Sequence, residues 1–148
     1  MQQTLTKTAE LAGLIYKDMK MGADSIINLL PKVDDEAMRS RMTEQLDGYE
    51  KFAKQAKEVL DAEGVEPREE GMMSKMGAKM GMSMKTMVDS TSSHIAELMM
   101  EGSVMGICEL TRTLRTFENT NCSEDMLRLC RAIIKFENDN LESAKQYL

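Results

Sequence analysis

Proline, strand-like alternation and long apolar runs are all scarce in this sequence of 148 residues. It contains 2 prolines, and nowhere do β-branched residues alternate with polar ones. Proline disrupts helix interiors and period-two alternation marks half-buried strands, so the scarcity of both indicates an all-α chain. No apolar run approaches the roughly 20 residues that span a bilayer. We therefore expect an all-α protein without a transmembrane segment.

The sequence also lacks the signals of secretion and of a disulfide framework. Its first residues, Met-Gln-Gln-Thr-Leu-Thr-Lys-Thr, contain no apolar block of the kind that signal peptides carry. Cys108, Cys122 and Cys130 are an odd set without a Cys-x-x-Cys pair, which is atypical of a disulfide-stapled domain. These absences favour a cytoplasmic protein, with Cys108 and Cys130 in the core and Cys122 exposed in a loop.

Positive charge is in deficit, and recognisable catalytic motifs are missing. The formal net charge is −6 and no basic patch interrupts the acidic balance, so nucleic acid is not expected as a partner. The sequence has no Gly-rich phosphate loop, nucleophile–base pair or haem-attachment motif. An enzymatic role stays open, but these absences favour a protein without one.

What the sequence does contain is apolar residues spaced by threes and fours, the period of an amphipathic helix. Over residues 5–30 this spacing continues without a break and predicts a long helix that Pro31 ends. A second series follows Asp34, a candidate N-cap, and predicts a helix over residues 35–63. Because the connection is tight, we expect the two helices to form an antiparallel hairpin, residues 3–63.

The second half predicts another hairpin, residues 89–148, after a crossover over residues 64–88. We expect the crossover to be helical over residues 71–87 and to pack apart from the other helices. One straight helix from there to Asn119 would be about 70 Å long, far longer than its partners. The capping residues at 89–93 therefore predict a break in the helix.

The last predicted helix, residues 123–148, carries polar residues within its apolar stripe. Spacings of three and four run through Glu137 and Asn140, so both side chains are expected to face the interior. A buried polar group is costly without a partner, so each should find a hydrogen bond inside the bundle. The candidate partners on the other helices are Tyr16, Tyr49 and Gln45.

The first hairpin resembles a known family. Residues 11–18, Leu-Ala-Gly-Leu-Ile-Tyr-Lys-Asp, through residues 48–50, Gly-Tyr-Glu, are similar to the first hairpin of small bacterial ferritin-like proteins of unassigned function. Those proteins share the Leu-x-x-Leu-Ile pattern, an Asp on the next turn and a short turn into the second helix. The resemblance implies a single domain, residues 1–148, with a ferritin-like antiparallel four-helix bundle and a long crossover between helices two and three.

The metal site of ferritin-like bundles uses a Glu on each of two helices and a Glu-x-x-His pair on each of the other two. Here an Asp and an Asn stand where the two histidines belong, and the single histidine, His94, lies on the third helix. The resemblance therefore implies either a degenerate centre without a cofactor or an all-oxygen site for magnesium, calcium or manganese. The candidate ligands are Glu44, Asp47, Glu101, Glu137 and Asn140.

Three functions are open on this evidence. The first is a non-catalytic ferritin-like bundle with a degenerate metal centre that forms a homo-oligomer or binds a protein partner. The second is a divalent-metal-binding protein with carboxylates from several helices. The third is a copper(I)-handling protein, because the 16 methionines include Met80-Gly-Met82-Ser-Met84 within residues 72–87. The three-and-four spacing of those methionines instead predicts a buried packing stripe or an exposed interaction surface.

Overall fold

The computed structural model describes residues 4–67 and 90–148 of the chain. Four α-helices lie in these ranges: α1 (Lys7–Leu29), α2 (Glu36–Ala62), α4 (Ser92–Phe117) and α5 (Glu124–Lys145), with a short 3-10 helix, η1 (Leu30–Lys32), between the first two. The described residues contain no strand, which confirms the all-α prediction. No helix among them has both the length and the apolar character that crossing a bilayer requires.

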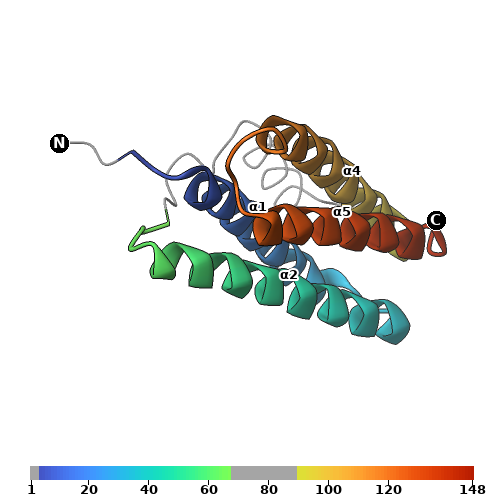
Figure 1. Cartoon of the computed structure of the whole chain (residues 1–148). Helices are drawn as coiled ribbons and strands as arrows, with labels where there is room; N and C mark the ends of the chain where they lie inside the picture. The colour runs from blue at the N-terminus through green and yellow to red at the C-terminus, as the bar shows by residue number, and fades with distance from the viewer. Residues whose placement is uncertain (1–3, 68–89) are drawn as a thin grey trace.

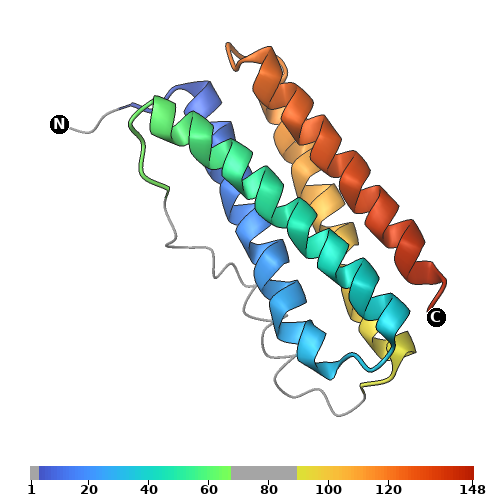
Figure 2. The ribbon, with the colours of Figure 1, turned by 90° about the horizontal axis from the view of Figure 1, so that it is seen from below.

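The helices associate in two pairs. α1 packs along α2 and α4 packs along α5, whereas contacts between the pairs are sparser. Figures 1 and 2 show the pairs side by side, with the chain reversing direction at η1 and again between α4 and α5. Figure 2 also shows that α2 ends and α4 begins at opposite ends of the bundle. Most of the predicted crossover, including residues 72–87, lies outside the described residues.

Each α-helix begins at a side-chain N-cap, whose oxygen accepts a hydrogen bond from the backbone N–H three residues on. The caps are Thr6, Asp35, Thr91 and Ser123. Thr91 places the start of α4 inside the break predicted at 89–93. The predicted cap Asp34 is wrong by one residue, because Val33 is buried after η1 and the chain needs Asp34 to return to the surface. Gly64 follows α2 with a φ of +68°, the left-handed conformation that favours glycine.

The apolar faces of the four helices meet in one core. Its fully buried side chains include Leu11, Ile15, Met42, Leu60, Ile95 and Ile133. Cys130 belongs to this core as predicted, but Cys108 is exposed and Cys122 is buried, so both of those predictions are wrong. The loop before α5 is pinned to the start of α1, because the Ser123 N–H donates a hydrogen bond to Thr8 Oγ1 at 2.9 Å. This hydrogen bond holds the neighbouring residue Cys122 close to the bundle, where it is buried.

Candidate functional site

A polar cluster lies inside the bundle where α2 faces α5. Glu137 and Asn140 project from α5 and are only 4% and 8% exposed, which confirms that both face the interior. The Tyr49 hydroxyl on α2 donates a hydrogen bond to Glu137 Oε1 at 2.5 Å. The Asn140 side-chain amide donates to the same oxygen at 3.2 Å. The protein therefore supplies Oε1 with two donors of its own, and Tyr49 is one of the three partners that the sequence had suggested.

Gly22 and Gly48 leave space for the aromatic rings of Tyr49 and Phe136. A Cβ at Gly22 on α1 would lie 2.5 Å from the Tyr49 ring, and a Cβ at Gly48 on α2 would lie 2.5 Å from the Phe136 ring. Phe136 also meets Tyr49 edge-on, with ring centroids 5.1 Å apart. The phenol is thus held between α1 and α5, and its hydroxyl has a fixed direction toward Glu137.

The second carboxylate oxygen of Glu137 lies against the backbone of α4. A Cβ at Gly106 would be 2.5 Å from Glu137 Oε2, so only glycine leaves room for the carboxylate at this position. From the sequence alone, Gly106 had no predicted role. Its position within the apolar series of α4 was the available signal, because a glycine inside a helix lowers stability and often marks a close approach.

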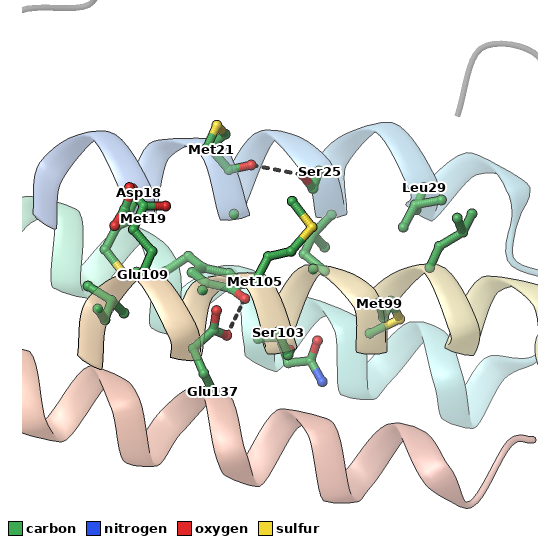
Figure 3. Close-up of a pocket in the computed structure, with 18 residues that line it drawn as sticks. Asp18, Met19, Met21, Ser25, Leu29, Met99, Ser103, Met105, Glu109 and Glu137 are labelled. Atoms are coloured by element: carbon green, nitrogen blue, oxygen red, sulfur yellow. Dashed lines mark hydrogen bonds between the residues drawn. The ribbon is translucent and has the colours of Figure 1, made fainter. Parts of the chain in front are cut away.

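A pocket opens between α1 and α4 above this cluster, with a cavity volume of about 80 Å³. Three carboxyl groups line it, from Asp18 on α1, Glu109 on α4 and Glu137 on α5. Figure 3 shows Asp18 and Glu109 next to each other at one end and Glu137 rising from the floor. The remaining walls are mostly apolar, and none of the lining residues is Lys, Arg or His. The part of the pocket wall formed by described residues is therefore acidic and carries no opposite charge.

Burial and like charges change how the pocket carboxyl groups ionise. Burial, with the nearby charges of Glu109 and Glu137, raises the pKa of Asp18 from 3.8 to about 7, against a smaller opposing effect of Lys17. Since Figure 3 places Glu109 directly beside Asp18, the second of these causes has a visible geometric basis. Asp18 therefore exchanges its proton near neutral pH.

Glu137 behaves similarly, although hydrogen bonds partly offset its burial. Burial raises the pKa of Glu137 from 4.5 to about 7, and the donors Tyr49 and Asn140 act in the opposite direction. The pKa of Tyr49 is raised well above 10.0, first by burial and then by the charge of Glu137. Tyr49 thus stays a neutral hydrogen-bond donor at every physiological pH.

Gln45 is the buried polar residue that the cluster does not satisfy. It lies one turn before Tyr49 on α2, is only 5% exposed and lines the pocket. Its side-chain Nε2 has no hydrogen-bond partner. The three-and-four spacing of this helix predicts an interior position for Leu46, but Leu46 is only partly buried and Gln45 faces inward instead. Helix geometry explains the difference, because Gln45 lies four residues from Tyr49 and shares its face.

The five candidate metal ligands do not come together. Glu137 and Asn140 are buried next to each other, whereas Glu44, Asp47 and Glu101 are exposed. In the part of the chain that the structure describes, no three His, Cys, Asp or Glu side chains are grouped closely enough to hold a metal ion. The helix period explains the outcome, because Glu44 is one residue from buried Gln45 and so points about 100° away from it.

The sole histidine lies in the first turn of α4 and does not belong to the polar cluster. His94 Nδ1 is 3.3 Å from Glu97 Oε2, and this pair is solvent-exposed. Neither residue lines the pocket. Comparison of the chain with protein-family models, with curated proteins and with solved structures found no match.

Proposed function

We propose that this protein is a non-catalytic ferritin-like bundle whose metal centre has been replaced by a structural polar cluster, and that it acts through association with itself or a protein partner. The observation that carries the proposal is the environment of Glu137 Oε1, which accepts hydrogen bonds from Tyr49 and Asn140. A carboxylate oxygen engaged by two internal donors already has the partners that burial demands.

The ferritin-like part of the proposal rests on sequence and arrangement together. Two helical pairs, the chain reversals within each and the placement of the end of α2 opposite the start of α4 are compatible with two antiparallel hairpins joined by a crossover over residues 64–88. The residues that resemble ferritin-like proteins, 11–18 and 48–50, lie on α1 and α2 beside the polar cluster. The resemblance and the cluster therefore concern the same part of the bundle.

The non-catalytic part of the proposal rests on what stands at the ligand positions. Asp47 and Asn140 occupy the places of the two histidines, and Asp47 is exposed. A metal at Glu137 Oε1 would have to displace the Tyr49 and Asn140 donors, and among the described residues no group of three His, Cys, Asp or Glu side chains is close enough to hold it. No described contact favours the copper(I) alternative, whose methionine motif lies outside the described residues.

Metal content tests this proposal. Protein purified without chelator should contain far less than one equivalent of any transition metal, and EDTA should not change its melting temperature. Anaerobic addition of iron(II) followed by oxygen should produce no oxo-bridged iron absorption band. A di-iron stoichiometry at micromolar affinity would contradict the proposed degenerate centre and would favour the divalent-metal alternative.

Association is tested separately, by sedimentation over a wide range of concentrations. Ile27 on α1 and Val104 on α4 are large apolar side chains with 49% and 45% exposure, and each is a candidate contact. We expect the mass to exceed that of one chain and to fall in the variants Ile27→Ser and Val104→Ser. Asn28→Ser, at an exposed position beside Ile27, is the matched control and should leave the mass unchanged.

A further inference from the structure

The pocket between α1 and α4 combines walls of methionine with an acidic end. Met21 on α1 and Met99 and Met105 on α4 line it and are only partly buried. At one end the exposed Glu109 stands beside Asp18, as Figure 3 shows. The cavity of about 80 Å³ is roughly half of one that binds benzene, so it holds about three non-hydrogen atoms. That is the end of one side chain, inserted by a segment that lies over the pocket.

The part of the sequence between α2 and α4 has a composition complementary to this pocket. Residues 71–88 contain no Asp or Glu, although the whole chain has a net charge of −6. Their charged residues are Lys75, Lys79 and Lys85. Flexible thioether side chains adapt to irregular apolar surfaces, and this stretch is rich in them: Met72, Met73, Met76, Met80, Met82, Met84 and Met87.

The chain on either side of this segment limits where it can lie. Residue 67 follows the end of α2 and residue 90 precedes the start of α4, and Figure 2 shows these points at opposite ends of the bundle. The bundle is about 40 Å long, from the 27 residues of α2. A fully extended chain from residue 67 to residue 90 reaches about 75 Å, so the segment must run lengthwise beside the helices. Tethering at both ends gives it a local concentration of about millimolar or more at the bundle surface.

Two routes join these points, one over α1 and one over α5. α2 packs mainly on α1, and α4 packs mainly on α5, so the segment has to pass over one of those two helices. On α5 the acidic side chains at the surface already pair with basic ones: Asp125 with Arg128, Glu124 with Arg131, Asp139 with Lys135 and Glu142 with Lys145. No Lys, Arg or His is among the described residues that line the pocket on the other route. Charge complementarity therefore favours the route over α1.

The level of Glu109 along the bundle selects one lysine. Glu109 lies about 12 Å from the C-terminal end of α4, and Figure 2 places that end of α4 at the same end of the bundle as residue 67. This is about a third of the length of the bundle. A segment that advances evenly from residue 67 to residue 90 has Lys75 at this level, whereas Lys85 is near the other end.

We propose that residues 71–88 dock over the pocket between α1 and α4, with methionine side chains on its apolar walls and the ammonium group of Lys75 at Glu109. The segment then packs against α1 and α4, in place of the separate packing expected from the sequence. Docking keeps Asp18 buried, and burial is the largest cause of its raised pKa. The inference goes beyond the proposed function, since it assigns an occupant to the pocket and depends neither on metal content nor on association.

Zero-length cross-linking of the full chain tests the contact directly. A carbodiimide joins an amine and a carboxyl group that touch each other as an amide, with loss of water, and mass spectrometry identifies the linked residues. We expect Lys75 to link to Glu109 and not to Glu50, an exposed glutamate on α2 that does not line the pocket. Lys85 should not link to Glu109.

An equal mixture of unlabelled and isotope-labelled protein distinguishes the chain's own segment from that of a second copy. Docking within one chain gives cross-linked peptides that are either fully labelled or fully unlabelled. Peptides that join a labelled to an unlabelled half would show that another copy occupies the pocket, and would overturn the proposal.

Limited trypsin digestion measures how firmly the segment is held, because docking protects its lysines. Glu109→Gln should raise the rate of cleavage at Lys79 by about two- to fivefold, the effect of one exposed ion pair. Glu50→Gln is the matched control and should leave that rate unchanged. Methyl NMR on the unaltered chain, which is independent of how variants fold, should show contacts from methionines of the segment to Met99 and Met105. Absence of these contacts, no Lys75–Glu109 product, or equal effects of the two Gln variants would overturn the proposal.

Discussion

The hydroxyl of Tyr49 and the carboxylate of Glu137, 88 positions apart in the chain, meet at 2.5 Å inside the bundle. This hydrogen bond joins α2 of one helical pair to α5 of the other, and those two helices otherwise contact each other little. A buried bond between sparsely packed elements constrains how the pairs are rotated and shifted relative to each other. The stability of the bundle should therefore respond strongly to changes at these two residues.

Replacement of Glu137 should distinguish loss of charge from loss of hydrogen bonding. Glu137→Gln retains an oxygen that accepts from Tyr49 and Asn140, so we expect it to change the free energy of unfolding at pH 7 by less than about 1 kcal/mol. Glu137→Leu leaves both donors without an acceptor and should cost about 2–6 kcal/mol, from about 1–3 for each unsatisfied group. Urea unfolding measures both. A Glu137→Leu variant as stable as the parent would contradict the structural role.

Stability should fall as the pH rises from about 4 to about 7. Asp18 and Glu137 both have folded-state pKa values of about 7, above their ordinary values of 3.8 and 4.5. The folded state thus binds more protons than the unfolded state in this range, and its stabilisation is complete below the lower values and lost through pH 7. Each group contributes about 1.4 kcal/mol per pH unit between pH 5 and pH 7, so we expect a decrease of roughly 5 kcal/mol between pH 5 and pH 8.

Isosteric amides provide the control for this pH dependence. The groups that face Glu137 and Asp18 from the neighbouring helices are Tyr49 and Glu109, and the raised pKa of Tyr49 keeps its hydroxyl protonated throughout this range. Asp18→Asn and Glu137→Gln should each flatten the profile, whereas Asp24→Asn on the exposed side of α1 should not. Profiles that stay parallel to the parent in both amide variants would refute the assignment.

The glycines of α1 offer a matched pair of substitutions. A Cβ at Gly22 would lie 2.5 Å from the rigid Tyr49 ring, whereas a Cβ at Gly13 would have nothing within 4 Å. Gly13→Ala should stabilise the protein by roughly 0.5–1 kcal/mol through helix propensity alone. Gly22→Ala should lower stability by about 1–3 kcal/mol, because the ring must move away from Glu137. A melting temperature above that of the parent for Gly13→Ala and below it for Gly22→Ala would confirm that Gly22 positions the phenol.

Gln45 should lower the stability of the protein. Its unsatisfied Nε2 is buried, so Gln45→Met removes an uncompensated donor at nearly constant volume. We expect the variant to be more stable than the parent by about 1–3 kcal/mol. Leu46→Met, at the partly buried neighbouring position, should change stability by less than about 1 kcal/mol. A loss of stability in Gln45→Met would show that the amide has a partner in solution.

Helix positions and the buried face of α5 could be predicted from the sequence because they follow from local periodicity. The three-and-four spacing placed Glu137 and Asn140 inside, and the need to satisfy a buried carboxylate pointed to Tyr16, Tyr49 and Gln45, of which Tyr49 makes the hydrogen bond. The spacing did not decide between Gln45 and Leu46 for the interior position, because Leu46 is the more apolar of two adjacent residues and periodicity tolerates either. Which of them faces inward depends on how α2 is rotated against α5, and that rotation is set by tertiary packing.

The pocket could not be predicted, because its residues come from α1, α2, α4 and α5 and no short motif unites them. Asp18 is the Asp of the segment that resembles ferritin-like proteins, but its proximity to Glu109 depends on how α1 and α4 are shifted along each other. The exposed positions of Glu44 and Glu101 show that a family pattern alone does not predict which side chains face the interior. A family pattern can assign residues to metal-ligand positions, yet one step along a helix turns a side chain from the interior to solvent.

The most direct test of the structural polar cluster is a double-mutant cycle between Tyr49 and Glu137, measured by urea unfolding in the presence of EDTA. Tyr49→Phe and Glu137→Leu should each be destabilising. Together they should cost about 1–2 kcal/mol less than the sum of the two, because the double variant leaves neither member of the pair unsatisfied. Losses that add to within about 0.5 kcal/mol, or a parent protein that EDTA unfolds, would contradict a metal-free centre held by this hydrogen bond.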